Sequence, residues 1–311
     1  MFKSLINEIR LTICLSTEGP LLISAGDTNL LDPSLPDMRF IRCNYNGEET
    51  VFIPGSSLKG VFRSRYEQLI KHLGKSICNI FDKKTRCSHL ISDKQTISDN
   101  HSKKTITGKQ MYEESCAACR LFGNLKMGGR IQFTDAYPDS VNDIPVRISK
   151  RNSVGIDRLT GAASSGALYD FEVVESGIFK FQITLSNFAR YQLALILAIL
   201  DDVDAGFVSF GMGTTRGNGK MTLSNRENIP AVYRYYGMEP VAVLCGYSPK
   251  DAGGSISVMK GIFAQEAHIN GYVDIFSSLG INSDNLIEAI NKENWQDVLL
   301  CQPIGSATDE Y

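Results

Sequence analysis

The chain has 311 residues, of which 43% are hydrophobic and 21% are charged. This balance is typical of a globular protein and excludes a disordered or fibrous chain, and a chain of this length can bury a core without disulfide bonds. The formal net charge is -2 and the pI is about 6.1, whereas a generic nucleic-acid-binding domain is basic. A nucleic-acid surface would therefore have to come from the distribution of the charges and not from their sum.

The first predicted element is a strand over residues 5–16, where apolar and polar side chains alternate. A loop rich in proline and glycine follows up to Pro36; it contains Asp27 and Asp32, and Asp37 comes directly after it. Carboxylates on such a loop could act in proton transfer or hold a divalent cation. Aspartates that only form turns are the commoner explanation of this pattern.

Residues 38–53 predict a hairpin with an Asn-Gly turn, and residues 53–60 then open a helix with Ser56 or Ser57 as its expected N-cap. The amide groups of a helix N-terminus, these two hydroxyls and Lys59 together would make a phosphate cradle. The spacing of a P-loop is absent. A capped surface helix with a solvated lysine fits the same residues equally well.

Residues 76–115 are polar and show no sustained hydrophobic period, so we expect an insertion there. A CxxC pair follows at its end, and such a pair can place two thiolates on one ion. The expected Zn²⁺ ligands are Cys87, His89, Cys116 and Cys119, with Cys78 as a substitute for one of the first two. All four positions would be filled by protein, which indicates a structural metal. Buried free cysteines and a thioredoxin-type redox pair are the alternatives.

Residues 146–167 are rich in glycine and serine and basic at their start, which predicts a projecting loop or hairpin. A basic segment of this kind, with Arg151 and Arg158, can follow phosphates and place an apolar side chain between bases. Taken alone, the segment is better explained as a solvated loop.

Alternating residues 170–185 predict strands around a turn, and residues 189–200 predict an apolar helix. The segment 210–220 contains four glycines, which allow close approach of a ligand to the backbone, and Arg216 and Lys220 supply charge. A mobile hairpin would have the same composition.

The order strand, helix, strands, helix, strand predicts an α+β fold with a ferredoxin-like or RRM-like sheet and long insertions. Residues 229–311 look like a C-terminal extension with helices at 284–290 and 294–300. The first residues carry an early acid and no apolar h-region, and the longest apolar run, 193–200, is too short to span a bilayer. We therefore expect a cytoplasmic protein with no membrane contact.

Several segments, in order, resemble the conserved blocks of the CRISPR RAMP superfamily, and in particular the backbone subunit of type III effector complexes. The matching segments are Ile53–Gly60, Cys119–Gly123, Phe133–Ala136, Asn152–Ala162, Gly166–Tyr169 and Gly211–Gly219. The resemblance covers roughly residues 5–225. Its specificity comes from the order of the blocks more than from any single block.

This resemblance implies an RRM-like palm with a thumb at 145–170, within a core that we expect at residues 1–228. The zinc-binding insertion expected at 76–120 and the extension 229–311 exceed a minimal backbone subunit and depart from the resemblance. It implies stacking of such subunits along crRNA, with target RNA and the other subunits of the complex as further partners. The implied RNA contacts are Ser56, Ser57, Lys59, Arg63, Arg151, Arg158, Gly213, Arg216 and Lys220. They would bind phosphate and sugar, because the guide sequence varies while the protein does not.

The resemblance also implies cleavage of target RNA by an aspartate of the first loop, with Mg²⁺ or Mn²⁺, through attack of a 2′-hydroxyl on the adjacent phosphate. Asp32 is the first candidate, Asp37 the second and Asp27 the third. A backbone subunit that binds without cutting is the main alternative. A crRNA-processing ribonuclease fits less well, because the chain has only four histidines. A stand-alone zinc hydrolase would require an open metal position.

Overall fold

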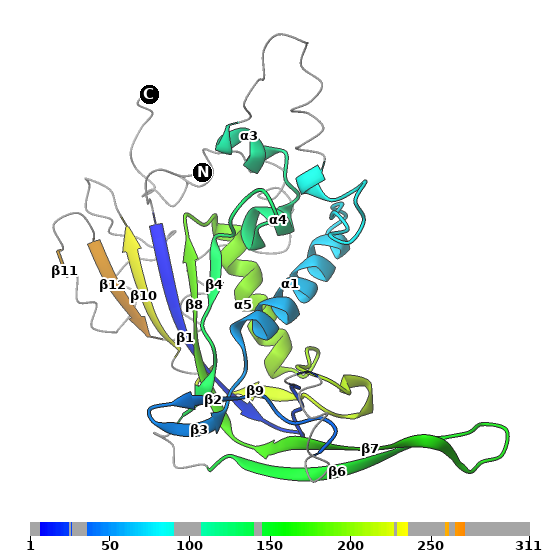
Figure 1. Cartoon of the computed structure of the whole chain (residues 1–311). Helices are drawn as coiled ribbons and strands as arrows, with labels where there is room; N and C mark the ends of the chain where they lie inside the picture. The colour runs from blue at the N-terminus through cyan, green and yellow to red at the C-terminus, as the bar shows by residue number, and fades with distance from the viewer. Residues whose placement is uncertain are drawn as a thin grey trace, which may run out of the picture.

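Figure 1 shows the computed structural model of the chain as an antiparallel sheet backed by two helices, with a long two-stranded hairpin at one end. The structure describes residues 7–24, 26, 36–89, 107–139, 145–226, 229–235, 259–260 and 265–270. Within these residues, no helix is both long and apolar enough to cross a membrane. The helices predicted at 284–290 and 294–300 lie outside the described residues.

The described residues combine antiparallel strands with helices, as predicted for an α+β fold. The strands are β1 (Asn7–Thr17), β2 (Arg42–Tyr45), β3 (Glu48–Val51), β4 (Ile131–Phe133), β5 (Tyr137–Pro138), β6 (Arg147–Ile156), β7 (Ala163–Ser176), β8 (Ile178–Ser186), β9 (Met221–Leu223), β10 (Pro230–Tyr235), β11 (Met259–Lys260) and β12 (Gln265–Asn270). The helices are α1 (Gly55–His72), α3 (Gly108–Glu113), α4 (Ala117–Phe122), α5 (Arg190–Asp204) and the 3₁₀ turn η2 (Thr214–Arg216).

Strand β1 lies at the centre of the main sheet, and all of its pairings are antiparallel. Its partner on one side is β8, from Glu8 opposite Ser186 to Ser16 opposite Ile178. On the other side, β10 pairs with the first half of β1 and β9 with the second half. Strand β4 pairs with the outer edge of β8, while β12 and β11 follow β10. Residues 230–235 and 265–270 are therefore joined to the rest of the sheet by backbone hydrogen bonds.

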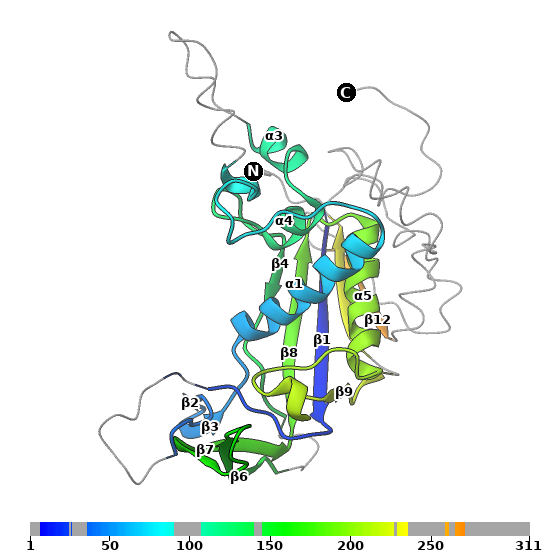
Figure 2. The same cartoon turned by 90° about the vertical axis from the view of Figure 1, so that its right-hand side faces the viewer.

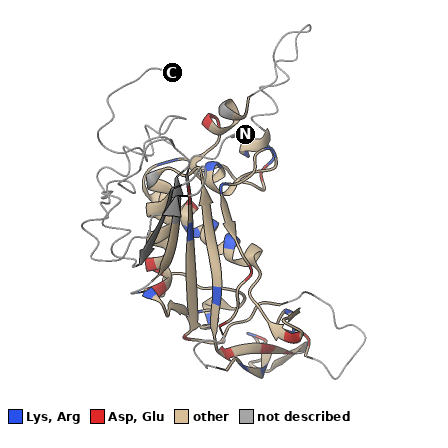
Figure 3. Ribbon diagram, turned by 90° about the vertical axis from the view of Figure 1, so that its left-hand side faces the viewer, with Lys and Arg blue, Asp and Glu red and all other residues tan. Residues whose placement is uncertain are grey.

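Helices α1 and α5 cover one face of this sheet (Figure 2). The alternation along β1 places Ile9, Leu11, Ile13 and Leu15 under the helices, all fully buried. The apolar stripe of α1 recurs every four residues and consists of Leu58, Phe62, Tyr66 and Ile70, also fully buried. Each such side chain contributes about 1.5–3 kcal/mol through burial. No described helix covers the opposite face, which carries exposed Arg10 and Lys180 and looks toward the viewer in Figure 3.

Helix α1 begins earlier than predicted, and neither Ser56 nor Ser57 is its N-cap. The N-cap is Pro54, whose carbonyl oxygen accepts the N–H of Ser57 over 2.9 Å. The N–H of Gly55 donates to the carboxylate of Asp135 over 2.7 Å. A carboxylate from a distant loop thus supplies the acceptor that a local serine was expected to provide.

The segment predicted as a projecting loop or hairpin is a hairpin formed by β6 and β7 (Figure 1). Its turn is held by Asp157, whose carboxylate accepts the N–H groups of Leu159 and Thr160. Strand β7 runs on to Ser176, and after Gly177 the chain enters β8 in the main sheet. The alternating residues 170–185 therefore form two strands, but these strands belong to different sheets.

Candidate functional site

Four cysteines from two distant parts of the insertion meet at the end of α1. The Sγ atoms of Cys78, Cys87, Cys116 and Cys119 all lie within 4.8 Å of one another. The Cys78 sulfur lies 3.5 Å from that of Cys119 and 3.7 Å from that of Cys116. Four thiolates bound to one Zn²⁺ at about 2.3 Å would lie about 3.8 Å apart. The cluster therefore has the size and the ligand type of a closed tetrahedral zinc site.

Cys87, Cys116 and Cys119 of the predicted ligand set lie in this cluster, whereas His89 does not belong to it. Cys78, the predicted substitute, is the fourth member. Cys87 and His89 lie on one helical turn, and residues two apart on a helix point to different sides. The presence of four thiols in one cluster also favours a metal site over an isolated redox pair.

Short backbone segments position the second pair of cysteines. Cys116 is the N-cap of α4, and its N–H donates to the Cys87 sulfur over 3.3 Å. Helix α4 ends at Gly123, which has a positive φ and lies against Gly129; a Cβ on Gly123 would come within 2.5 Å of the Gly129 nitrogen. Only glycine permits this turn, which returns the chain from the cysteine cluster to β4.

The guanidinium of Arg63 contacts the cysteine cluster. It lies 3.6 Å from the Cys119 sulfur, donates to the Gly123 carbonyl over 3.1 Å and pairs with Glu67 over 2.9 Å. A Zn²⁺ ion with four thiolates would carry a net charge of about -2, which an adjacent arginine would stabilise. Arg63 was predicted as an RNA contact, but in this structure its donors are directed to the chain itself.

The thiols of the cluster share protons unequally. Hydrogen bonds from the Cys119 and Cys87 thiols lower the pKa of Cys116 strongly. The same interaction raises the pKa of Cys119, and it raises that of Cys87 to about 12. Among these three thiols, Cys116 would therefore lose its proton most easily, and the others would lose theirs on metal binding.

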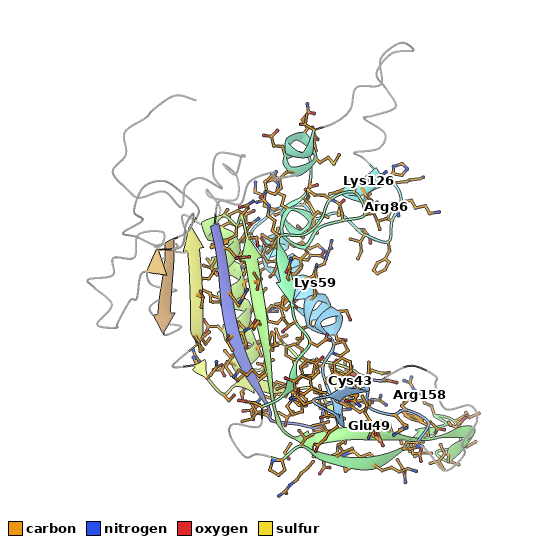
Figure 4. The ribbon with its side chains drawn as sticks, turned by 60° about the vertical axis from the view of Figure 1, so that its left-hand side comes forward. Cys43, Glu49, Lys59, Arg86, Lys126 and Arg158 are labelled. Atoms are coloured by element: carbon orange, nitrogen blue, oxygen red, sulfur yellow. The ribbon has the colours of Figure 1, made fainter. Side chains whose placement is uncertain are left out.

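The second candidate region is the β6–β7 hairpin, which ends in an exposed apolar tip. Ile156 is 64% exposed, Leu159 is 95% exposed and Leu168 is 71% exposed. Arg158 lies in the turn (Figure 4), while Arg151 forms an ion pair with Glu175 over 3.1 Å nearer the base. The hairpin thus presents apolar side chains and cations on a projecting arm, as expected for a surface that inserts into or against nucleic acid.

The glycine-rich loop from Phe210 to Lys220 packs closely against its own chain. A Cβ on Gly211 would lie 2.2 Å from the Leu22 oxygen, and one on Gly219 would lie 1.9 Å from the Phe210 oxygen. The N–H of Gly219 also donates to the Pro20 oxygen over 2.8 Å. These two glycines therefore serve the close packing of the loop on itself and on the segment after β1. From the sequence, close approach of a ligand and a mobile hairpin were the two interpretations of the loop.

The cations of this loop have partners within the chain. The Arg216 guanidinium donates to the Tyr169 hydroxyl over 2.8 Å and so links the loop to the hairpin. This hydrogen bond lowers the pKa of Tyr169. Lys220 pairs with Glu18 over 2.7 Å, and both side chains remain substantially exposed. Gly213 has a positive φ and begins the 3₁₀ turn η2 that carries Arg216.

The cradle predicted at the start of α1 retains Ser56, Ser57 and Lys59 on the first turns of the helix. This end of α1 faces the base of the hairpin in Figures 1 and 2. Burial lowers the pKa of Lys59, and the nearby positive charge of Arg63 lowers it further. A phosphate near Lys59 would stabilise the charged form of the lysine and raise its pKa again.

Of the three candidate aspartates, Asp27 and Asp32 lie outside the described residues. The main-chain N–H of Asp37 donates to the Asp170 carboxylate over 2.8 Å, and the N–H of Asp170 donates to the Asp37 carboxylate over 3.0 Å. Lys150 also pairs with Asp170, and these contacts lower the Asp170 pKa. The carboxylate of Asp37 is therefore engaged in joining the first loop to β7.

Sequence reasoning missed three residues that organise these regions. Asp135 caps α1, Tyr169 binds the guanidinium of the glycine-rich loop, and Phe81 stands 89% exposed between two cysteines of the cluster. Asp135 and Tyr169 both lie in the matching blocks, but their partners are distant along the chain. The Cys78–Cys87 spacing, read as a closed loop, could have drawn attention to Phe81.

Comparison with known families identifies the chain. The model of the RAMP superfamily matches residues 14–222, which include the end of β1, all of α1, the cysteine cluster, the hairpin, α5 and the glycine-rich loop. Among curated proteins, none matches the chain. The family match covers more than half of the sequence and agrees with the resemblance seen in its ordered blocks. The chain belongs to the RAMP superfamily, a family of CRISPR-associated RNA-binding proteins.

Proposed function

We propose that this protein is the crRNA-binding backbone subunit of a type III CRISPR antiviral complex, with a structural Zn²⁺ ion in the four-cysteine cluster. The observation that carries the proposal is the link between the hairpin and the glycine-rich loop through Tyr169 and Arg216. It places an apolar-tipped arm and a basic loop in one unit, as a protein that holds RNA at intervals requires. Zinc-bound thiolates would hold the insertion rigid.

The strand order supports an RRM-like palm for this subunit. Strand β1 is flanked by β9 and β8, β4 lies beyond β8, and α1 and α5 cover one face. This is the arrangement expected of a ferredoxin-like unit. We propose residues 1–228 as the core, with the insertion at 76–120 and the thumb at 145–170, and residues 229–311 as an extension. The RAMP match ends at residue 222, in agreement with that boundary.

The proposed RNA contacts are the cations that remain accessible around the palm and the thumb. They are Lys59, Arg151, Arg158, Arg216 and Lys220, together with the hydroxyls of Ser56 and Ser57 and the turn at Gly213. Arg151 and Lys220 would exchange an ion-pair partner for a phosphate, at modest cost because such exposed pairs contribute only about 0–1 kcal/mol. Arg216 would keep its hydrogen bond to Tyr169 and use its other donors. Arg63 is the weakest of the predicted contacts, since its guanidinium is held at the cysteine cluster.

The proposal extends to cleavage of bound target RNA by a carboxylate of the first loop. In this reaction the 2′-oxygen attacks the adjacent phosphorus, its proton passes to a base, and the 5′-oxygen leaves. Asp32 is the proposed base, and Mg²⁺ or Mn²⁺ would stabilise charge on the phosphate. Asp37 is a weaker candidate because its carboxylate accepts the Asp170 N–H. Both ends of the loop are paired with β7, through Leu21 and Met38.

Two measurements test the proposal. The double substitution Arg151→Ala and Arg158→Ala should weaken crRNA binding and lower the salt dependence of the binding constant by about 1.4 in slope. In the assembled complex, Asp32→Ala should remove regularly spaced cuts in target RNA while Asp37→Ala leaves them. Unchanged crRNA binding in the double variant would refute the thumb contacts. Unchanged cuts with Asp32→Ala would favour a subunit that binds without cutting.

A further inference from the structure

The loop between Cys78 and Cys87 forms a closed and ordered surface of its own. Both of its ends belong to the four-cysteine cluster. Inside the loop, the Asn79 side chain accepts the N–H of Phe81 over 3.0 Å, and the Asp82 carboxylate accepts the N–H of Lys84 over 2.9 Å. Asp82 also accepts the Thr85 hydroxyl. We call residues 79–86 the knuckle loop.

The knuckle loop combines one exposed aromatic side chain with several cations. Phe81 is 89% exposed, and Lys83 and Lys84 are exposed directly after it. Arg86 follows, and Lys126 lies on the same side of the insertion (Figure 4). Within the described part of the chain, none of these four cations forms an ion pair. The one carboxylate of the loop, on Asp82, is bound to the loop's own backbone.

Exposure of a whole phenyl ring costs free energy unless a partner covers it, and the surrounding cations select a polyanionic partner. Single-stranded RNA supplies both a phosphate for each cation and a base for the ring. An acidic protein would satisfy the lysines, but it would not require a flat, unobstructed ring among them. The chemistry therefore favours RNA.

We propose that the knuckle loop binds single-stranded RNA, with Phe81 stacked on one base and Lys83, Lys84, Arg86 and Lys126 on neighbouring phosphates. The inference rests on the proposed function only in taking RNA as the ligand. The knuckle loop and the hairpin lie toward opposite ends of α1 (Figures 1 and 4). The knuckle loop is thus a second contact that would hold RNA beyond the segment bound at the palm and thumb.

The test uses the full-length, zinc-loaded protein and a fluorescein-labelled single-stranded oligouridine, followed by anisotropy at several salt concentrations. Phe81→Ala should weaken binding by about 5- to 150-fold, and Phe81→Tyr should restore it. The double substitution Lys83→Ala and Lys84→Ala should lower the slope of log K against log salt by about 1.4. As a matched control, Arg10→Ala with Lys180→Ala removes two exposed charges from the open face of the sheet and should change neither quantity.

Binding by Phe81→Ala equal to that of the wild type would overturn the inference, as would an equal effect of the matched control. Loss of binding in the Arg151→Ala and Arg158→Ala variant, with the knuckle variants unaffected, would overturn this inference and leave the proposed function standing. The reverse pattern would support the knuckle contact and count against the thumb contacts. A knuckle variant that binds RNA normally but fails to assemble into the complex would assign the surface to a protein partner instead.

Discussion

Replacement of Cys78 by serine should remove one of four metal ligands, while replacement of His89 by alanine should remove none. The Cys78 sulfur lies 3.5 Å from that of Cys119 and 3.7 Å from that of Cys116, close to the edges of a zinc tetrahedron. His89 lies outside the cluster although it is only two residues from Cys87. The two substitutions therefore test whether the fourth ligand is Cys78, as the structure indicates, or His89, as the sequence spacing predicted.

The size of the effect follows from the affinity of structural zinc sites. Such sites bind Zn²⁺ with an apparent free energy of about 10–16 kcal/mol, so one ligand of four accounts for about 2.5–4 kcal/mol. Loss of Cys78 should weaken zinc binding by about 10²- to 10³-fold. A serine hydroxyl is of similar size but is not deprotonated near neutral pH, so it does not replace the thiolate.

Zinc affinity can be measured by competition with a chromophoric chelator, and zinc content by elemental analysis after dialysis. The wild type and His89→Ala should hold one zinc per chain with equal affinity, and Cys78→Ser should lose it to the chelator. Retention of zinc by Cys78→Ser, together with its loss from His89→Ala, would refute the assignment. A wild-type protein free of zinc after refolding with the metal would refute the site as a whole.

Three further predictions concern contacts within the fold. Arg63→Ala should lower zinc affinity by about 10- to 100-fold in the same competition assay, because the guanidinium lies 3.6 Å from a ligand sulfur, whereas Arg65→Ala should not. Gly219→Ala should lower the free energy of unfolding by at least about 2 kcal/mol in urea, because its φ is +83° and its Cβ would lie 1.9 Å from the Phe210 oxygen; a smaller loss would show that the glycine-rich loop can shift. Burial acts to raise the pKa of Glu172, but the hydrogen bond from Arg42, which pairs with it over 2.8 Å, contributes to lowering it overall. The contribution of Glu172 to stability should therefore be present above the ordinary carboxyl range and disappear as the pH falls through the lowered pKa. The difference in urea midpoint between wild type and Glu172→Gln should accordingly shrink on acidification. A constant difference would show that the charge of Glu172 does not contribute to stability.

Elements with a strong internal period could be predicted from the sequence. The alternation along β1 depends on one face being buried, and the strand predicted from it over residues 5–16 is present with that face buried. The helix predicted to open within residues 53–60 is also present and buries a stripe with four-residue spacing. The Asn-Gly turn between β2 and β3 also has the expected positive φ at Asn46 and Gly47. In these cases the information lies within a few residues of the feature itself.

Features that depend on distant partners could not be predicted in this way. The cap of α1 comes from Asp135, 80 residues after Gly55, so the local serines gave a plausible but wrong N-cap. The two reciprocal hydrogen bonds between Asp37 and Asp170 join segments 133 residues apart. His89 lies outside the cluster because it shares a helical turn with Cys87 and points to another side. A single turn in a short polar segment is poorly specified by the local sequence. Sequence spacing therefore predicted three of the four cysteines that meet in the cluster as first-choice ligands, and it gave Cys78 only as a substitute.

Helix α1 connects the metal cluster to the proposed RNA surface at its first turns. Lys59 and Arg63 lie four residues apart on one side of the helix, and Arg63 is bound to Cys119. A metal that fixes Cys119 would therefore also fix the rotation of α1 and the position of Lys59. Chelation of zinc should increase amide hydrogen exchange in α4 and in α1 while leaving β6 and β7 protected, because the hairpin lies beyond the far end of the helix. Equal loss of protection in the hairpin would mean that the metal stabilises the whole chain, and α1 would then have no special part in transmitting its effect.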